Sequence, residues 1–365
     1  MHRNPEVSGK ESSTAGWIAS RLKKLKADQV WKNIGGSGVI ALYKSRSGKA
    51  EQSLLFRAEL DAIAVQEETG LKHESRNSGV MHGCGHDGHM TILLGLAHWL
   101  KKHRPEDKDV YLLFQPAEET GEGAERVMSD ERFKRMHFDY AFALHNLPGF
   151  AERNIVTRKG LFAAASTGLE IIFKGKSSHA AYPEKGENPS IAIAKTILEV
   201  DSIAGPFRED HALNKAVNTF IKLGEPAYGI SPGNGRTGFT FRSVSDKSLS
   251  QIVDEVKKQV QKTERDFKGQ INMKLVEPFC ATVNDEKGVE LIEQSAKENG
   301  YNIEQLNEAF PWSEDFGEFR KKCPIAIFGL GAGKDSAPLH SEMYDFNDSI
   351  IEAGINTFIG IIKRS

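Results

Sequence analysis

Apolar residues recur along this chain at two different spacings, which predicts helices and strands in alternation. The apolar residues between Trp17 and Leu25 are spaced as on one face of a helix, which we expect over residues 14–26. Short β-branched and aromatic runs predict strands, and one further helix is expected among them. The strands are expected at 38–43, 54–60, 110–114 and 140–144, and the helix at 89–103. This alternation predicts an α/β fold, with a mostly parallel sheet and helices on both faces.

The order of elements changes after about residue 161. The expected elements are a strand at 168–174, a helix at 189–203, strands at 216–223 and 237–241, a helix at 248–267 and a strand at 271–276. The order βαββαβ is typical of a ferredoxin-like α+β unit. Longer elements then return: a helix at 288–299, a strand at 325–328, a Gly-rich loop at 329–333 and a helix at 348–363. We therefore predict a larger domain of residues 1–161 and 277–365, and an inserted domain of residues 162–276.

Length, charge and cysteine content narrow the class of protein. A chain of 365 residues is long enough for two hydrophobic cores. Its 48 basic and 50 acidic residues give a formal net charge of -2, which favours a small-molecule partner over nucleic acid or a membrane surface. The three cysteines are few and far apart, as expected in a reducing compartment. Because the first residues are charged and no long apolar run follows, we expect a cytoplasmic protein.

The segment 81–89 holds the densest group of possible metal ligands. Cys84 and His86 are two residues apart, so their side chains would leave the same side of an extended loop. The neighbouring glycines would let the backbone wrap closely around an ion. A Cys-x-His pair can supply two metal ligands, but a solvated loop that caps the following helix is an equal alternative from this segment alone.

Two adjacent carboxylates, Glu118 and Glu119, follow the strand expected at 110–114. Neighbouring side chains point in different directions, so one carboxylate can bind a metal while the other faces a water molecule. An acidic surface loop is the usual alternative for such a pair. Their place just beyond a strand favours the chemical interpretation, because ligands in open α/β sheets bind at the carboxyl ends of the strands.

His145 ends the strand expected at 140–144, and His340 follows the Gly-rich segment 329–333. A single histidine at a strand end is usually structural. Here four segments each deliver ligand-type side chains to the same edge of the sheet, which predicts a metal site. The Gly-rich segment lacks the full spacing of a phosphate-binding loop. No serine-hydrolase elbow is present, and no second cysteine lies near Cys84 to support a redox role.

At this point the sequence resembles the aminoacylase and carboxypeptidase superfamily of dinuclear metallohydrolases. It is similar in particular to the amidohydrolase branch that includes hippurate hydrolases, N-acetyl-diaminopimelate deacetylases and plant indole-acetyl-amino acid hydrolases. The similar segments run in order over essentially the whole chain: residues 2–8, 57–62, 84–87, 116–119, 143–145, 175–183, 313–316 and 339–341.

The resemblance implies two divalent ions, zinc or manganese, bound by five side chains: Cys84, His86, Glu119, His145 and His340. It implies that the Cys84 thiolate bridges the ions and that Glu118 is the general base. It also implies that Asp61 orients the ligands from behind. His179 matches a histidine of the inserted lid and dimerisation domain that stabilises the oxyanion, often in the other subunit of a homodimer.

Some residues depart from the pattern of the relatives. Glu59 replaces the first acid of an Arg-Ala-Asp-Met-Asp motif, and Ala64 replaces a proline. Residues 229–233 replace an Asn-Val-Ile-Pro-Asp segment, so an asparagine near the substrate is missing. Arg242 matches an arginine that faces the substrate carboxylate in many relatives, and a bidentate clamp is one interpretation. An arginine exposed to solvent is the other.

The resulting hypothesis is a metal-dependent amidohydrolase that cleaves N-acyl amino acids with acetyl, benzoyl or aryl-acetyl groups. Glu118 would take a proton from water and return it to the leaving amine. A dipeptidase or aminopeptidase of the same superfamily is the first alternative. A binding protein without catalysis is the second, and the intact pair of Glu118 and Glu119 argues against it.

Overall fold

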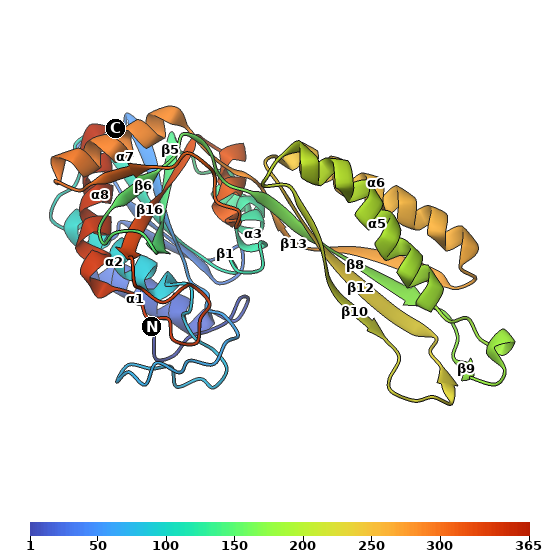
Figure 1. Ribbon diagram of the computed structural model, residues 1–365. Helices are drawn as coiled ribbons and strands as arrows, with labels where there is room; N and C mark the ends of the chain where they lie inside the picture. Colours follow the sequence, from blue (N-terminus) through green and yellow to red (C-terminus); the bar gives the residue numbers. More distant parts are fainter. The chain divides into compact units, whose positions relative to one another are not determined.

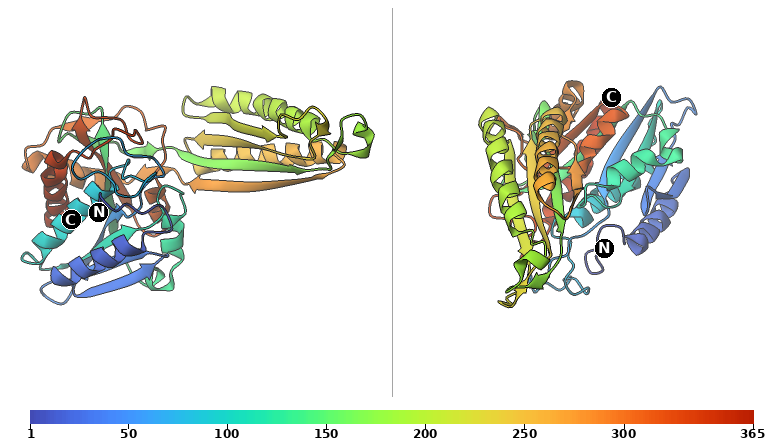
Figure 2. Two further views of the ribbon diagram at one scale, coloured as in Figure 1. Left: turned by 90° about the horizontal axis from the view of Figure 1, so that it is seen from below. Right: turned by 90° about the vertical axis from the view of Figure 1, so that its right-hand side faces the viewer.

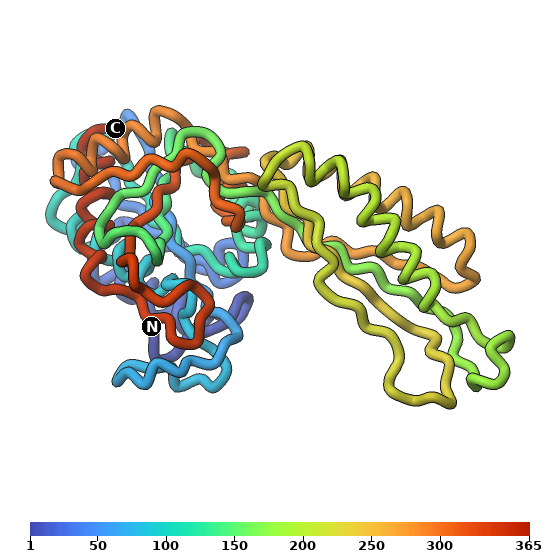
Figure 3. The backbone as a smooth tube through the Cα atoms, viewed as in Figure 1, coloured from blue at the N-terminus to red at the C-terminus, as the bar shows by residue number.

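The computed structural model describes residues 1–365 and divides the chain into two units. Unit 1 comprises Met1–Phe162, Thr282–Ala309 and Glu314–Ser365, and unit 2 comprises Ala163–Ala281 with Phe310–Ser313. The colour order in Figure 3 shows that unit 2 is formed mainly by the middle of the chain, whereas both ends of the sequence build unit 1.

Unit 1 is built on an eight-stranded mixed sheet. The strand order is β1 (Gln29–Ile34), β2 (Gly38–Tyr43), β4 (Lys108–Gln115), β3 (Gln52–Glu59), β5 (Tyr140–Pro148), β16 (Ile325–Gly333), β6 (Ile155–Thr157) and β15 (Ile303–Gln305). The pairs in the middle, β4 with β3, β3 with β5 and β5 with β16, are parallel. β1 pairs antiparallel with β2, and β2 with β4. Since β4, β3, β5 and β16 run in one direction, their carboxyl ends meet at one edge of the sheet.

Helices cover both faces of this sheet (Figure 1). Successive side chains of a strand point to opposite faces, so Phe56 and Arg57 of β3 face different layers. The layer on the Phe56 side consists of α1 (Ser12–Lys24), α2 (His86–Leu100), α7 (Glu286–Glu298) and α8 (Ile351–Arg364). The other layer consists of α3 (Gly123–Ser129), α4 (Glu131–Lys134) and the 3-10 helix η2 (Asp315–Lys321). The predicted α/β class is confirmed.

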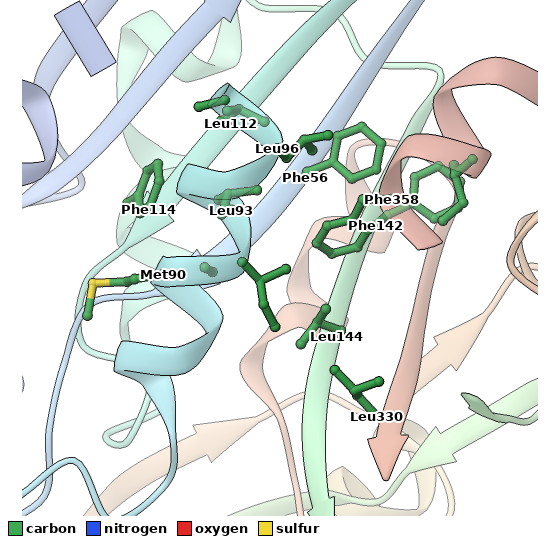
Figure 4. Close-up of a cluster of buried hydrophobic side chains, with 14 of the residues drawn as sticks. Phe56, Met90, Leu93, Leu96, Leu112, Phe114, Phe142, Leu144, Leu330 and Phe358 are labelled. Atoms are coloured by element: carbon green, nitrogen blue, oxygen red, sulfur yellow. The ribbon is translucent and has the colours of Figure 1, made fainter. Parts of the chain in front are cut away.

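The main core of unit 1 lies between the sheet and the α2–α8 layer (Figure 4). The ring of Phe56 stacks on Phe142 of β5 at 5.6 Å and meets Phe358 of α8 edge-on at 5.0 Å. Leu93 and Leu96 of α2 are fully buried against the same strands. Burial of this apolar surface fixes α2 on the sheet, and thereby fixes the loop that leads into α2.

Unit 2 has a four-stranded antiparallel sheet with strand order β10 (Lys215–Leu223), β12 (Asn234–Ser243), β8 (Ala165–Lys174) and β13 (Gln270–Phe279). The helices α5 (Ser190–Asp210) and α6 (Asp246–Asp266) pack side by side on one face of it (Figure 2). This is the βαββαβ order that the sequence predicted. A short antiparallel pair, β9 (Ser178–His179) with β11 (Ile230–Ser231), and the 3-10 helix η1 (Pro183–Lys185) extend from the sheet.

Two sequence-based expectations need correction or adjustment. The residues expected as a Gly-rich loop, 329–333, are instead the second half of β16, because Gly329 pairs with His145 and Gly331 with Leu147. The inserted unit extends past residue 276, because β13 continues to Phe279, which pairs with Ser166 of β8. The remaining short elements are β7 (Gly160–Ala163), β14 (Thr282–Asn284) and η3 (Asp348–Ile350). None of the helices is both long and apolar enough to span a bilayer.

Candidate metal centre

Cys84 and His86 lie on either side of a left-handed turn at the start of α2. Gly85 has φ +84°, and a Cβ atom there would lie 2.5 Å from Asn146 Oδ1 and 2.6 Å from the hydroxyl oxygen of Tyr344. Only glycine fits this conformation and this space. The two side chains therefore converge through a turn rather than through the extended loop that we expected, and His86 is already the first residue of the helix.

Glu118 and Glu119 follow β4 through a second left-handed residue, Ala117, with φ +53°. The buried carboxylate of Glu11 accepts the N–H of Ala117 at 2.9 Å and the N–H of Gly9 at 2.7 Å. Because an L-residue rarely adopts a positive φ, the hydrogen bond from Ala117 to Glu11 helps to hold this turn. The turn directs both glutamates to the carboxyl edge of the sheet.

His145 and His340 complete the group. We expected His145 to end its strand, but β5 continues for three residues beyond it. His340 follows β16 with φ +64°, and its N–H donates to the carbonyl of Gly83 at 2.8 Å. This bond ties the segment of His340 directly to the loop that carries Cys84.

The five side chains are arranged around two adjacent positions that share Cys84. The ligand atoms of Cys84, His86 and His145 lie within 4.8 Å of one another, and so do those of Cys84, Glu119 and His340. Cys84 Sγ is 3.5 Å from His145 Nε2. The two oxygens of Glu119 lie 3.9 Å from His86 Nε2 and 3.7 Å from His340 Nε2. Two divalent ions would be held by these five side chains, with Cys84 present in both groups.

Buried polar atoms without partners indicate that the group fits metal ions. His86 Nε2 and Glu119 Oε1 are buried and have no hydrogen-bond partner. Such atoms carry a large desolvation cost unless something else binds them. His86 donates its Nδ1–H to the carbonyl of Asp61 at 2.9 Å, and His145 donates its Nδ1–H to that of Asn146 at 2.9 Å. Each ring therefore presents the Nε2 lone pair to the site.

The electrostatic environment favours a positive charge at this place. Burial and the nearby Glu119 and Glu118 carboxylates raise the pKa of the Cys84 thiol well above its usual value. Burial tends to lower the pKa of His86, but Asp61 and Glu59 outweigh it and raise that pKa to about 10. A bound divalent cation would replace these protons and balance the carboxylates. The donor set of thiolate, imidazole and carboxylate suits zinc or manganese.

Asp61 lies directly behind the ligands and is completely buried. Its Oδ2 accepts the N–H of Glu119 at 3.0 Å and the hydroxyl of Ser8 at 2.7 Å, and its Oδ1 lies 3.5 Å from His86 Nδ1. Burial tends to raise the pKa of Asp61, but the hydrogen bond from His86 and that ring's charge outweigh it and lower the pKa. Asp61 therefore orients two of the proposed ligands at once.

Glu118 faces the same group but in a different environment. Its Oε2 lies 3.9 Å from His86 Nε2, and its Oε1 lies 3.5 Å from the backbone N–H of Asp315. Burial, followed by the charges of Glu314, Glu119 and Asp315, raises the pKa of Glu118 well above its usual value. A carboxyl group with a raised pKa, next to a cation site, is suited to accept and release a proton.

A buried ion cluster behind Glu118 has no counterpart among the sequence-based predictions. Arg57 is fully buried and donates to Glu59, to Glu314 at 2.8 Å and to Asp315 at 2.6 Å. The position of the charged Arg57 within the apolar run of β3 could have indicated a buried ion cluster. Glu59 also accepts from His89 Nδ1 at 2.7 Å, so the longer side chain at this position reaches a buried partner. One cation among several carboxylates leaves excess negative charge beside Glu118.

The other two predicted site residues, His179 and Arg242, belong to unit 2. His179 is exposed at β9, and its Nδ1 accepts the N–H of Ala181 at 3.0 Å, which leaves a proton on Nε2 in the neutral ring. Arg242 is half-buried in β12 and donates to the carbonyl of Pro311 at 3.0 Å and to Ser313 Oγ at 3.1 Å. Arg242 is thus held in place rather than fully exposed.

Comparison with known proteins gives consistent matches over the whole chain. The model of the peptidase family M20/M25/M40 matches residues 55–364. An N-acetyldiaminopimelate deacetylase from Halalkalibacterium halodurans is 31% identical over 365 residues, covering 100% of this chain and 96% of the relative. A hippurate hydrolase from Campylobacter jejuni is 31% identical over 361 residues, covering 96% of this chain and 91% of the relative. A solved Bacillus subtilis structure, described as a dinuclear metal-binding peptidase of the M20 family, has a TM-score of 0.78 at 22% identity, covering 99% of this chain and 94% of that chain.

Proposed function

Since this chain belongs to the peptidase family M20/M25/M40, we propose that it is a metal-dependent amidohydrolase that cleaves N-acyl amino acids to a carboxylate and a free amino acid. The observation that carries the proposal is the buried group of five ligand side chains with Glu118 beside it. Two relatives support the substrate class, because their names describe a deacetylase of an N-acetyl amino acid and a hydrolase of hippurate, which is N-benzoylglycine.

Two divalent ions would be held by the five side chains, with Cys84 in both groups: Cys84, His86, Glu119, His145 and His340. Ions bound there supply Lewis acidity, which lowers the pKa of water and polarises a carbonyl oxygen. Asp61 keeps the ligands in place through the backbone of Glu119 and the ring of His86. Zinc and manganese are both compatible with this donor set.

Glu118 performs the proton transfers in this proposal. Its raised pKa matches a group that takes a proton from the attacking water and returns it to the leaving amine. The backbone N–H of Asp315, 3.5 Å from Glu118 Oε1, can donate a long hydrogen bond to the carboxyl group. Asp315 also has a raised pKa, because it is buried, but its carboxylate accepts hydrogen bonds from Arg57 and Gln115.

The substrate would be held by the two residues of unit 2. His179 presents an Nε2–H, which can donate to the oxyanion that forms during amide hydrolysis. Arg242 uses Nη1 for Pro311 and Ser313, so its Nη2 and Nε groups can bind the carboxylate of the amino acid. The proposal thus assigns the oxyanion to His179 and the amino-acid carboxylate to Arg242.

A substrate panel tests the proposal. The protein is loaded with zinc or manganese and assayed with N-acetyl, N-benzoyl, N-succinyl and N-indole-acetyl amino acids, and with dipeptides that have a free amine. We expect hydrolysis of at least one N-acyl series with kcat/KM well above that of the dipeptides. Preferential cleavage of dipeptides would indicate an aminopeptidase or dipeptidase instead. No hydrolysis with bound metal would favour a binding protein.

We further propose a cytoplasmic homodimer that pairs through unit 2. β10 is an edge strand, and its Val217 and Ile221 side chains are 52% and 56% exposed. An open edge with exposed apolar side chains is a ready surface for pairing. Cys84 and Cys323 form no disulfide, which supports a reducing compartment.

A further inference from the structure

Unit 1 contains a second group of metal-ligand side chains that the proposed reaction does not use. We call it the His2 cluster, and it comprises His2, Glu67, His73 and Asp345. One ligand atom from each of His2, His73 and Asp345 lies within 4.8 Å of the other two. His73 Nε2 is 3.0 Å from Asp345 Oδ1, and His2 Nε2 is 3.2 Å from Glu67 Oε1. The four residues come from three separate segments of the sequence, so crowding of charge within one segment does not explain their approach.

His2 is oriented as a metal ligand would be. Its Nδ1 lies 2.8 Å from Asp87 Oδ2, which leaves Nε2 facing Glu67. A carboxylate that accepts Nδ1–H of a histidine whose Nε2 binds a cation is the usual arrangement in protein metal sites. The ring of His73 meets the ring of His2 edge-on, with centroids 5.0 Å apart. Both imidazoles can therefore approach one ion.

A buried histidine beside the cluster provides an independent observation. The ring of His82 lies 6.4 Å from that of His2, and only 1% of the residue is exposed. Neither of its ring nitrogens has a hydrogen-bond partner. A buried imidazole without partners is costly unless a ligand, or water that a ligand orders, satisfies it. His82 therefore places two ring nitrogens without hydrogen-bond partners next to the cluster.

We propose that the His2 cluster binds a third divalent cation, of the zinc type, through His2, Glu67, His73 and Asp345. Two imidazoles and two carboxylates form a four-ligand set that suits tetrahedral zinc. Binding replaces the proton on His2 Nε2, which passes to solvent, and no bond other than these coordination bonds forms. The two carboxylates balance the charge of the ion.

The ion would join three segments around the active site. His2 belongs to the N-terminal segment, Glu67 and His73 to the loop before Cys84, and Asp345 to the segment after His340. Backbone bonds already connect them, from Glu68 N–H to the carbonyl of Glu342 at 2.8 Å and from Arg76 N–H to that of Arg3 at 2.9 Å. The expected role of the ion is therefore to stabilise the loops that hold the catalytic ligands.

Zinc stoichiometry of the purified chain, without an added polyhistidine segment, tests the site. Native mass spectrometry after zinc loading should count one ion fewer in His73→Ala and in Asp345→Asn than in the unchanged protein. His73 and Asp345 side chains are 49% and 38% exposed, so both variants should fold. His137→Ala removes an exposed histidine elsewhere in unit 1, and should bind as many ions as the unchanged protein. Equal counts in all four proteins would overturn the proposal.

A second measurement separates this site from the catalytic centre. In Cys84→Ala, zinc should still raise the unfolding temperature, and adding His73→Ala should make that rise smaller. If zinc stabilises Cys84→Ala and the double variant equally, the His2 cluster does not bind it. Because neither measurement uses turnover, failure of the proposed amidohydrolase activity would leave both results interpretable.

Discussion

Buried carboxylates crowd Glu118, and this environment determines what the residue can do. Glu118→Gln keeps the size and shape of the side chain but removes its ability to accept a proton. We expect the variant to bind metal as the unchanged protein does and to lose about 10²–10⁴-fold in kcat. Turnover of an active N-acyl amino acid and metal analysis of the same sample check this. Retained turnover would contradict the assigned role.

The raised pKa of His2 predicts how the stability of the fold depends on pH. Burial tends to lower its pKa, but Asp87 and Glu67 outweigh it and raise the pKa from 6.5 to about 9. The protonated ring therefore stabilises the fold fully below pH 6.5, and this contribution is lost as the pH rises to about 9. Allowing for partial exposure, we expect His2→Ala to cost on the order of 2 kcal/mol at pH 6.

The measurement for His2 is urea unfolding with a chelator present, so that no cation occupies the cluster. The difference in unfolding free energy between the unchanged protein and His2→Ala should shrink from pH 6 to pH 9.5. His137→Ala is the control, because its side chain is 82% exposed. A His2→Ala difference that stays constant over this range would exclude the assigned pKa shift as its cause.

At single residues, the sequence predicted functional side chains that are neighbours in the chain. It missed interactions between residues that only the fold brings together. Cys84 with His86 and Glu118 with Glu119 are neighbours in sequence, so their joint role could be proposed directly. The bond between Arg57 and Glu314 joins residues 257 positions apart. No local pattern indicates such a partner, because only the strand order brings the two side chains together.

At the level of elements, hydrophobic periodicity predicted the central strands and helices but failed at β16. Five residues of that strand, Gly329–Gly333, were expected as a loop, because glycine is usually unfavourable in strands. Here the close approach of neighbours selects glycine: a Cβ on Gly331 would lie 2.0 Å from the carbonyl oxygen of Ala151. The close contact between two backbone segments explains these glycines, and a sequence pattern cannot reveal such a contact.

This contact gives a prediction for β16. Gly331→Ala should destabilise unit 1 by at least about 2 kcal/mol, since the carbonyl of Ala151 would have to move. Gly16→Ala in α1 is the matched control: no atom lies within 4 Å of the added Cβ, so it should stabilise by about 0.5–1 kcal/mol. Urea unfolding measures both. Similar values for the two variants would show that β16 accommodates a side chain.

For the whole molecule, the sequence indicated a mostly parallel sheet and an inserted ferredoxin-like unit because each domain has its own periodic pattern. It did not indicate which surfaces pair with another chain, because apolar residues at an interface do not recur at a regular spacing in the sequence. Both edges of the unit 2 sheet are available: β10 carries Ile221 and β13 carries Leu275, which are 56% and 43% exposed. The proposed dimer uses the β10 edge.

A charge on either edge strand distinguishes the two surfaces. Sedimentation of the unchanged protein should give twice the chain mass of 40.4 kDa. Ile221→Lys should weaken the dimer at least about 10-fold, because two symmetry-related lysines would then face each other along the paired strands. Leu275→Lys adds the same charge to the opposite edge and should leave the dimer intact. A monomeric unchanged protein, or dissociation by Leu275→Lys alone, would rule out pairing through β10.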